Sequence, residues 1–313
     1  MTKFEIPQKT FEIAGVTLGG QPGEWPTVMC GSIFYDRHKI VRDASTGDFD
    51  KEAAKALLAN EKELAECFGL QRMPDVIGNT FEALVKYTDF VLEQVDGPIL
   101  VDSASIDVLL KTFRHYKNSD VISRMVFSPL DLHTTEEHFK EIADIGVKNA
   151  LVMAFSPDAV LPSQKIGILS GSENGKTVAS ESLLAKASQA GIENILVDVG
   201  VIDLQGTAWS SLSIEKEKSI LGLPAGCAPA NALFSWLRDH KDTMHSKPQT
   251  TAAGGAVYAS TIYSGADFVL YGPMHCADWA FAACASADAL VSYGNRLSGV
   301  RAKTRSHALY KLK

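Results

Sequence analysis

Cysteine is scarce in this chain, and its spacing forms no disulfide framework. Five cysteines occur in 313 residues, and no two of them make a Cys-x-x-Cys pair. An odd count with irregular spacing argues against a set of disulfides, so we expect a reducing compartment, the cytoplasm. We also expect no bound metal. One zinc site stays open as an alternative, with His275 and Cys276 acting together with Cys227 or Cys30, although adjacent His and Cys side chains rarely reach one ion.

Long apolar runs and an excess of basic residues are also missing. Residues 1–15 carry charges and no apolar block, which is unlike a signal peptide. The two uncharged stretches, 219–237 and 248–266, contain Gly, Pro or many hydroxyl side chains, unlike a membrane span. The 30 Lys and Arg are outnumbered by 37 Asp and Glu, which gives a net charge of −7. Because nucleic-acid binders usually show a basic face, we expect neither a membrane span nor a nucleic-acid partner.

The chain does contain a regular alternation of short apolar runs and amphipathic stretches. Each run is bounded by turn residues, as buried parallel strands are. Helix signals lie between the runs: Asp50 precedes a stretch that Gly69 ends, and Gly146 and Gly191 stand where glycine caps belong. Eight runs alternating with helices predict an α/β fold, a (β/α)8 TIM barrel. The predicted strands are residues 27–33, 75–78, 98–102, 124–128, 149–155, 194–199, 220–225 and 267–272.

Three segments fall outside this plan of a single domain, residues 1–313. Residues 1–26 predict an N-terminal hairpin-like extension, because an Ala-Gly turn at 14–15 separates alternating residues. Residues 156–176 form a long insert after the fifth strand, and residues 239–266 form another before the eighth. Long loops on the catalytic face of a barrel are often lids, and a plain surface excursion is the alternative.

Acidic residues end two of the predicted strands. Asp102 and Asp198 each follow a run of large apolar residues. The active site of a barrel lies at the C-terminal ends of its strands, and a carboxylate at an apolar mouth needs a partner to stay ionised. No basic cluster accompanies them, which disfavours a phosphate ligand. Two carboxylates suit a donor-rich edge such as the N2/N3 edge of a pterin, while helix capping is the alternative for each Asp.

Several segments together resemble a known family, the pterin-binding methyltransferases that include the H subunit of tetrahydromethanopterin S-methyltransferase. Within that family the chain looks most similar to bacterial methylcorrinoid:tetrahydrofolate methyltransferases. The resemblance implies a pterin-binding barrel and a homodimer. The segments that carry it are Ile13-Ala14-Gly15-Val16, residues 19–24 and 31–35, Val101-Asp102-Ser103, the strand with Asp198, and residues 267–273.

The resemblance also implies a reaction. A methyl group would move by SN2 transfer between methylcob(III)alamin, a cobalamin carried by a partner corrinoid protein, and N5 of tetrahydrofolate, which gives 5-methyltetrahydrofolate. The same transfer with tetrahydromethanopterin is one alternative, and a non-catalytic pterin-binding subunit of a larger complex is another. A pterin hydrolase or synthase would need Lys and Arg at late strand ends, where the sequence shows none.

By the same resemblance, individual residues receive roles. Asp198 would bind the N2/N3 edge of the pterin and Asp102 would lie near N5, so these two are the candidate catalytic residues. Related enzymes often place Asn at the ends of strands four and seven; here strand four ends at Ser128 and strand seven reads Gly-Leu-Pro-Ala at 222–225. Ser128 or Asn231 would then act near N5. The candidate substrate-binding residues are Asp75, Asn79, Asp102, Ser128, Met153, Asp198 and Gly200.

Three further features have ordinary explanations. Residues 171–177 resemble a phosphate-binding P-loop but have three residues between the glycines where the motif needs four. Residues 36–39 are expected in a solvated loop, with contact to the folate tail or the corrinoid protein as the alternative. Trp209 is expected in the core, with stacking on a ligand ring as the alternative.

Overall fold

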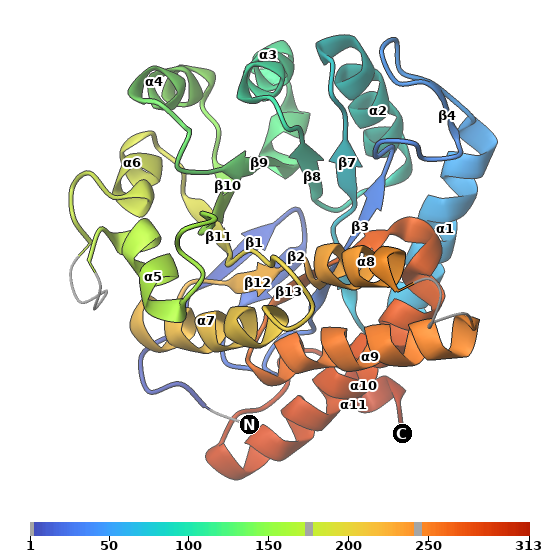
Figure 1. Ribbon diagram of the computed structural model, residues 1–313, viewed down its shortest axis with the longest axis vertical. Coiled ribbons are helices and arrows are strands. Elements are labelled where there is room, and N and C mark those ends of the chain that lie inside the picture. Colours follow the sequence, from blue (N-terminus) through green and yellow to red (C-terminus); the bar gives the residue numbers. More distant parts are fainter. Residues whose placement is uncertain (1–2, 173–177, 241–245) are drawn as a thin grey trace.

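Eight parallel strands close into a barrel, as the sequence predicts (Figure 1). The computed structural model describes residues 3–172, 178–240 and 246–313. Each strand pairs with the next along the chain, and the last pairs with the first to complete the ring. A two-residue strand, β6 (Gln71–Arg72), also pairs with β3. The barrel strands are β3 (Val28–Ile33), β7 (Asp75–Ile77), β8 (Ile99–Asp102), β9 (Met125–Leu130), β10 (Asn149–Met153), β11 (Asn194–Asp198), β12 (Ala225–Cys227) and β13 (Phe268–Pro273).

Helices surround the barrel and begin and end largely where capping residues predict. Asp50 accepts a hydrogen bond from the Ala53 amide at the start of α1, and Gly69 ends that helix in the left-handed conformation. Gly146 ends α4 in the same way. The helices are α1 (Lys51–Phe68), α2 (Phe81–Gln94), α3 (Ile106–Tyr116), α4 (Glu136–Ile145), α5 (Pro162–Ser170), α6 (Leu183–Gln189), α7 (Thr207–Ile220), α8 (Pro229–Asp239), α9 (Lys247–Tyr263), α10 (Ala277–Asn295) and α11 (Ala308–Lys311), with short 3-10 turns at Asp120–Arg124, Met274–Cys276 and Arg296–Ser298.

The strands are buried on both faces, which explains their nearly continuous apolar sequences. Side chains that point outward, such as Val101 and Val197, pack with the helices. Those that point inward, such as Leu100 and Leu196, form a separate cluster inside the barrel. Because side chains alternate along a strand, the residues two positions after Leu100 and Leu196 also point inward. Those residues are Asp102 and Asp198.

The N-terminal extension forms the predicted hairpin. Strands β1 (Thr10–Ile13) and β2 (Val16–Gly19) pair antiparallel around the Ala-Gly turn. Ile13 and Leu18 are buried in the interior cluster with Leu100 and Leu196. In Figure 1 the hairpin lies behind the barrel strands, so it closes the end of the barrel opposite the strand ends that carry Asp102 and Asp198.

The seventh strand and the long segment before the eighth differ from the sequence prediction. The seventh strand begins at Ala225 rather than Ile220, because α7 continues to Ile220 and the next apolar residues pack against the outer core. The long segment before the eighth strand is mostly helix α9, which packs against α10. It is therefore part of the helical layer rather than a loop. The insert after the fifth strand also contains a helix, α5.

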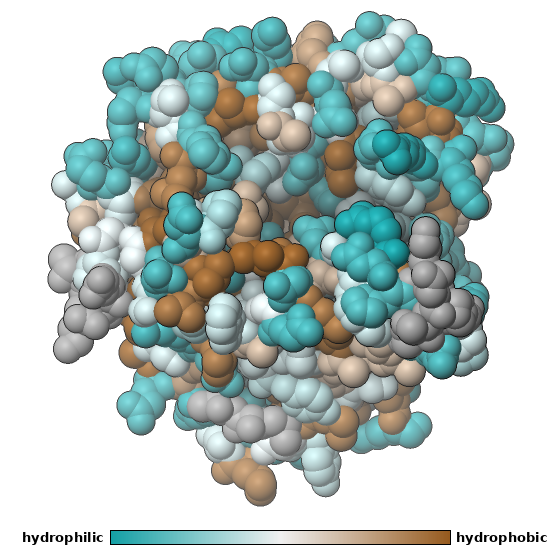
Figure 2. All heavy atoms as spheres, viewed as in Figure 1, coloured by the Kyte–Doolittle hydropathy of each residue, from teal (hydrophilic) through white to brown (hydrophobic). Residues whose placement is uncertain are grey.

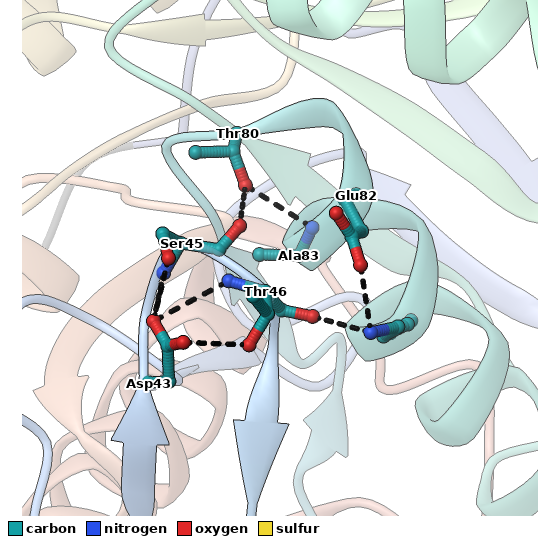
Figure 3. A network of polar contacts seen from close by, with 7 residues as sticks. Asp43, Ser45, Thr46, Thr80, Glu82 and Ala83 are labelled. Atoms are coloured by element: carbon teal, nitrogen blue, oxygen red, sulfur yellow. Dashed lines mark hydrogen bonds and ion pairs between the residues drawn. The ribbon is translucent and has the colours of Figure 1, made fainter.

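A small hairpin fixes the connection between β3 and α1 to the start of α2 (Figure 3). Strands β4 (Val41–Asp43) and β5 (Asp48–Phe49) form it. Asp43 accepts hydrogen bonds from the Ser45 hydroxyl and amide at 2.7 and 2.8 Å, and these bonds lower the pKa of Asp43 to about 2. Thr80, which caps α2, donates its hydroxyl to the Ser45 carbonyl oxygen at 2.8 Å. The rim of the barrel beside β7 is thereby held in place.

Among the described residues, no helix is both long enough and apolar enough to cross a membrane.

Candidate active site at the barrel mouth

Inward-pointing polar side chains gather at the mouth of the barrel. Asp102 and Asp198 end β8 and β11, whereas Asp75 is the first residue of β7 and lies beside the end of β3. Asp102 pairs with Ser128 across β8 and β9, Met153 pairs with Asp198 across β10 and β11, and Asp75 pairs with Ser32 across β7 and β3. Figure 2, drawn from the side of these strand ends, shows a hollow near the middle of this face. The parallel barrel therefore brings carboxyl groups from three separate strands to one end.

Asp75 is buried with one oxygen atom unpaired. Its side chain is 3% exposed, and the Ser32 hydroxyl donates a 2.7 Å hydrogen bond to Oδ2. Oδ1 is buried without a hydrogen-bond partner. Burial raises the pKa of Asp75 to about 6, and the bond from Ser32 opposes that rise. An unpaired buried acceptor is costly, and a ligand N–H group would satisfy it.

Asp102 is the carboxyl group that most strongly favours its neutral form. Burial raises the pKa of Asp102 well above its usual range, and the negative charge of Asp75 and then that of Asp198 raise it further. The Ser128 hydroxyl donates to Asp102 Oδ2 at 2.9 Å, which acts in the opposite direction. Three nearby carboxyl groups cannot all be charged at low cost, and Asp102 is the one that holds a proton.

Asp198 ends β11 and accepts a hydrogen bond from the backbone. The Gly200 amide donates a 2.7 Å hydrogen bond to Asp198 Oδ1. Burial raises the pKa of Asp198 to about 6, while the Gly200 bond and the nearby Lys165 charge oppose this shift. At neutral pH Asp198 is therefore mostly ionised, as a partner for a donor-rich ligand edge must be.

The remaining predicted residues differ in their placement. Met153 ends β10 beside Asp198 and is half-buried, and Gly200 contributes its backbone. Asn79 is exposed between β7 and α2, and Asn231 is exposed in the first turn of α8. Ser128, unlike Asn231, directly contacts a carboxyl group of the site.

Lys165 belongs to the site although the sequence pattern does not single it out. It comes from α5, inside the insert that follows β10, and not from a strand end. Its side chain is 2% exposed, and Nζ donates to the Gly200 carbonyl oxygen at 2.9 Å. Nothing in the residues around Lys165 predicts that its side chain is buried. The length of the insert is the one sequence feature that directs attention to this region.

Trp209 is not in the core. It is 46% exposed and lines a cavity of about 320 Å³ between α5 and α7, together with Val160, Ile202 and Lys165. The expectation of core packing was wrong, because α7 places Trp209 on its outer face. Its indole ring is available to a ligand beside the mouth.

A zinc site and a phosphate loop gain no support from the structure. In the part of the chain that the structure describes, no three His, Cys, Asp or Glu side chains meet as a metal-binding group, so zinc has no ligand set there. Gly171 is the left-handed cap of α5, and residues 173–177 of the P-loop-like segment lie outside the described residues. Asp36, Arg37 and Lys39 are exposed as expected, whereas His38 is buried and stacks on Tyr35.

Comparison with known proteins gives one consistent result. The sequence profile described as "Tetrahydromethanopterin S-methyltransferase MtrH subunit" matches residues 7–303. The H subunit of tetrahydromethanopterin S-methyltransferase from Methanopyrus kandleri is 34% identical over 96% of both chains. The same protein from Methanothermobacter thermautotrophicus is 32% identical over the full length of both chains. A dihydropteroate synthase from Xanthomonas albilineans shares the fold, with a TM-score of 0.57 and 15% identity over 91% of this chain and 98% of that one.

Proposed function

Because the chain belongs to the family of tetrahydromethanopterin S-methyltransferase MtrH subunits, we propose that it transfers a methyl group at N5 of a reduced pterin of the tetrahydromethanopterin type. The observation that carries the proposal is the set of three carboxyl groups at the barrel mouth: buried Asp75 at the start of β7, half-buried Asp102 at the end of β8, and buried Asp198 at the end of β11. The relatives named above all carry tetrahydromethanopterin in their names, so the tetrahydrofolate specificity expected from the sequence is replaced by the tetrahydromethanopterin alternative.

The donor pattern of a pterin fits the acceptors at this mouth. Ionised Asp198 accepts from the N2 and N3 protons of the pyrimidine ring, which is a strong charge-assisted pair. The unpaired Oδ1 of Asp75 offers a further acceptor in the same interior. A ligand that donates hydrogen bonds to these oxygens would remove the cost of leaving them buried and unpaired.

Asp102 supplies the proton that methyl transfer from N5 requires. When the C–N bond breaks, N5 keeps the electron pair, and protonating N5 makes it a better leaving group. The neutral carboxyl of Asp102 can donate that proton because its pKa is raised by burial and by the neighbouring Asp75 charge. General acid help of this kind contributes about 10²–10⁴-fold to a rate. In the reverse direction the same group takes the proton back.

A partner completes the reaction. A corrinoid protein would supply the cobalt centre that gives or accepts the methyl group, and the relatives' designation as a subunit suggests that this chain works within an assembly. A homodimer is a further proposal. This chain's own residues bind and orient the pterin and move the proton at N5.

The test is an anaerobic transfer assay. The purified chain is mixed with 5-methyltetrahydromethanopterin and cob(I)alamin, and loss of the Co(I) absorption band is followed against a sample without protein. Protein-dependent loss with this pterin supports the proposal. Loss with only 5-methyltetrahydrofolate would overturn the pterin assignment. Pterin binding without transfer, even with a corrinoid protein added, would favour a non-catalytic role within a complex, and no binding of either pterin would refute the proposal.

A further inference from the structure

The backbone of Gly200 is held by two oppositely charged side chains. Its amide donates to Asp198 Oδ1 at 2.7 Å, and its carbonyl oxygen accepts from Lys165 Nζ at 2.9 Å. The Ser210 hydroxyl donates to the same carbonyl oxygen at 2.6 Å. One residue therefore connects the carboxyl group at the end of β11 to a lysine on α5.

The turn at Gly200 requires glycine. Its φ is +64°, and a Cβ atom there would lie 2.9 Å from Cδ2 of Phe155. The bonds from Lys165 on α5 and Ser210 on α7 to the Gly200 carbonyl oxygen join these two helices to the turn that follows β11. The position of the Gly200 amide, and so the orientation of the Asp198 carboxyl group, depends on what holds the Gly200 carbonyl oxygen.

Lys165 is a costly residue to bury for structure alone. It is 2% exposed, and among the described residues no carboxylate forms an ion pair with it. Burying an ammonium group without an ion-pair partner is strongly unfavourable. A neutral side chain of similar length would fill the same space without this cost. The positive charge therefore has a use that packing does not explain.

We propose that Lys165 is a positioning residue for Asp198: it fixes the backbone of Gly200, whose amide orients the carboxyl group, and its positive charge holds Asp198 in the charged state that binds the N–H edge of the pterin. This inference rests on the proposed function. By this inference helix α5, which is not at a strand end, sets the pH range in which the site binds its substrate.

The charges around Asp198 support this role. The titratable groups that interact with it are Asp102 on β8, Cys30 on β3, Cys227 on β12 and Lys165 on α5. Lys165 is the one cation among these groups, and it opposes the effect of burial, which raises the pKa of Asp198 to about 6. Removing the positive charge would raise that pKa further. Pterin binding would then begin to fail at a higher pH.

The experiment measures the dissociation constant of tetrahydromethanopterin for the purified chain between about pH 5.5 and 8.5, anaerobically, by calorimetry. Lys165→Met keeps the length and removes the charge. We expect binding about fivefold weaker near pH 6 and within about threefold of the original protein near pH 8.5, which corresponds to a rise of about one unit in the pKa of Asp198. Ser210→Ala, the matched control, removes the other donor to Gly200 without changing charge and should leave the pH profile in place.

Two further variants keep the test decisive. Lys165→Arg retains the positive charge and should retain the original pH profile, which can be measured even if Lys165→Met fails to fold. In an Asp198→Asn background, Lys165→Met should cause no additional pH-dependent loss. Equal weakening at every pH, an unchanged profile in Lys165→Met, or a shifted profile in Lys165→Arg would overturn the inference. If the original protein binds no pterin at all, the proposed function fails instead.

Discussion

The Ser128 hydroxyl donates a 2.9 Å hydrogen bond to Asp102 Oδ2 across the paired ends of β8 and β9. The acceptor is the carboxyl group whose pKa burial and the Asp75 charge raise most clearly among the carboxyl groups of the mouth. Because Ser128 engages Oδ2, Oδ1 is the Asp102 oxygen left to interact with a ligand. Ser128 thus fixes the orientation of the Asp102 carboxyl group.

Asp102→Asn separates proton transfer from binding. Asparagine keeps the shape and a donor but cannot release a proton. We expect methyl transfer to slow by about 10²–10⁴-fold while the affinity for the pterin changes less than about tenfold. Steady-state rates and binding constants for the same preparation measure the two effects. Ser128→Ala, which keeps the carboxyl group, should lose much less activity. An Asp102→Asn protein with the original rate would remove Asp102 from the chemistry.

Asp198→Asn tests the recognition of the pterin edge. It replaces an ionised acceptor by an amide that accepts at only one atom, so we expect affinity for tetrahydromethanopterin to fall by about 1.5–3 kcal/mol. Asp96→Asn is the matched control, because Asp96 is exposed and precedes β8 at the opposite end of the barrel. Calorimetric titration of both variants makes the comparison. Equal affinities for the two variants would exclude Asp198 from the site.

The barrel and the two strand-end aspartates could be predicted because both depend on local pattern. Short apolar runs, caps such as Asp50 and Gly69, and the alternation of Leu100 with Asp102 are readable along the chain. Lys165 was not predictable, since its burial depends on how α5 packs against α7 and β11. The same holds for Trp209, whose side of α7 depends on a helix with little amphipathic character.

Asp75 gives a pH dependence of stability with a defined sign. Burial raises the pKa of Asp75 from 3.8 to about 6, so the folded protein binds this proton more tightly than the unfolded chain does. The resulting stabilisation is full below the unfolded pKa and is lost as the pH rises through about 6. In Asp75→Asn this loss is absent. We measure the unfolding free energy of both proteins in urea and subtract the value for Asp75→Asn from that of the original protein. This difference should decline by about 2 kcal/mol between about pH 4 and 7. A difference that does not change with pH would contradict this account.

Gly226 tests the closure of the barrel. A Cβ atom at this position in β12 would lie 2.2 Å from the Phe268 carbonyl oxygen. Gly226→Ala must therefore shift β12 away from β13, and we expect it to reduce stability by about 1–3 kcal/mol. Gly167→Ala is the contrast, because no atom lies within 4 Å of the added group and the residue is inside α5. It should raise stability by up to about 1 kcal/mol. Denaturant unfolding measures the change in stability for each variant. Equal changes would refute the claim that Gly226 is needed for the close approach of β12 and β13.

The most direct test of the central claim, that the carboxyl groups at the barrel mouth bind a reduced pterin, is a crystal structure of the chain with tetrahydromethanopterin. The account predicts N2 and N3 of the pterin within hydrogen-bonding distance of the Asp198 carboxyl group, and N5 on the side of Asp102. A pterin bound instead in the cavity beside Trp209, with the three carboxyl groups untouched, would contradict it.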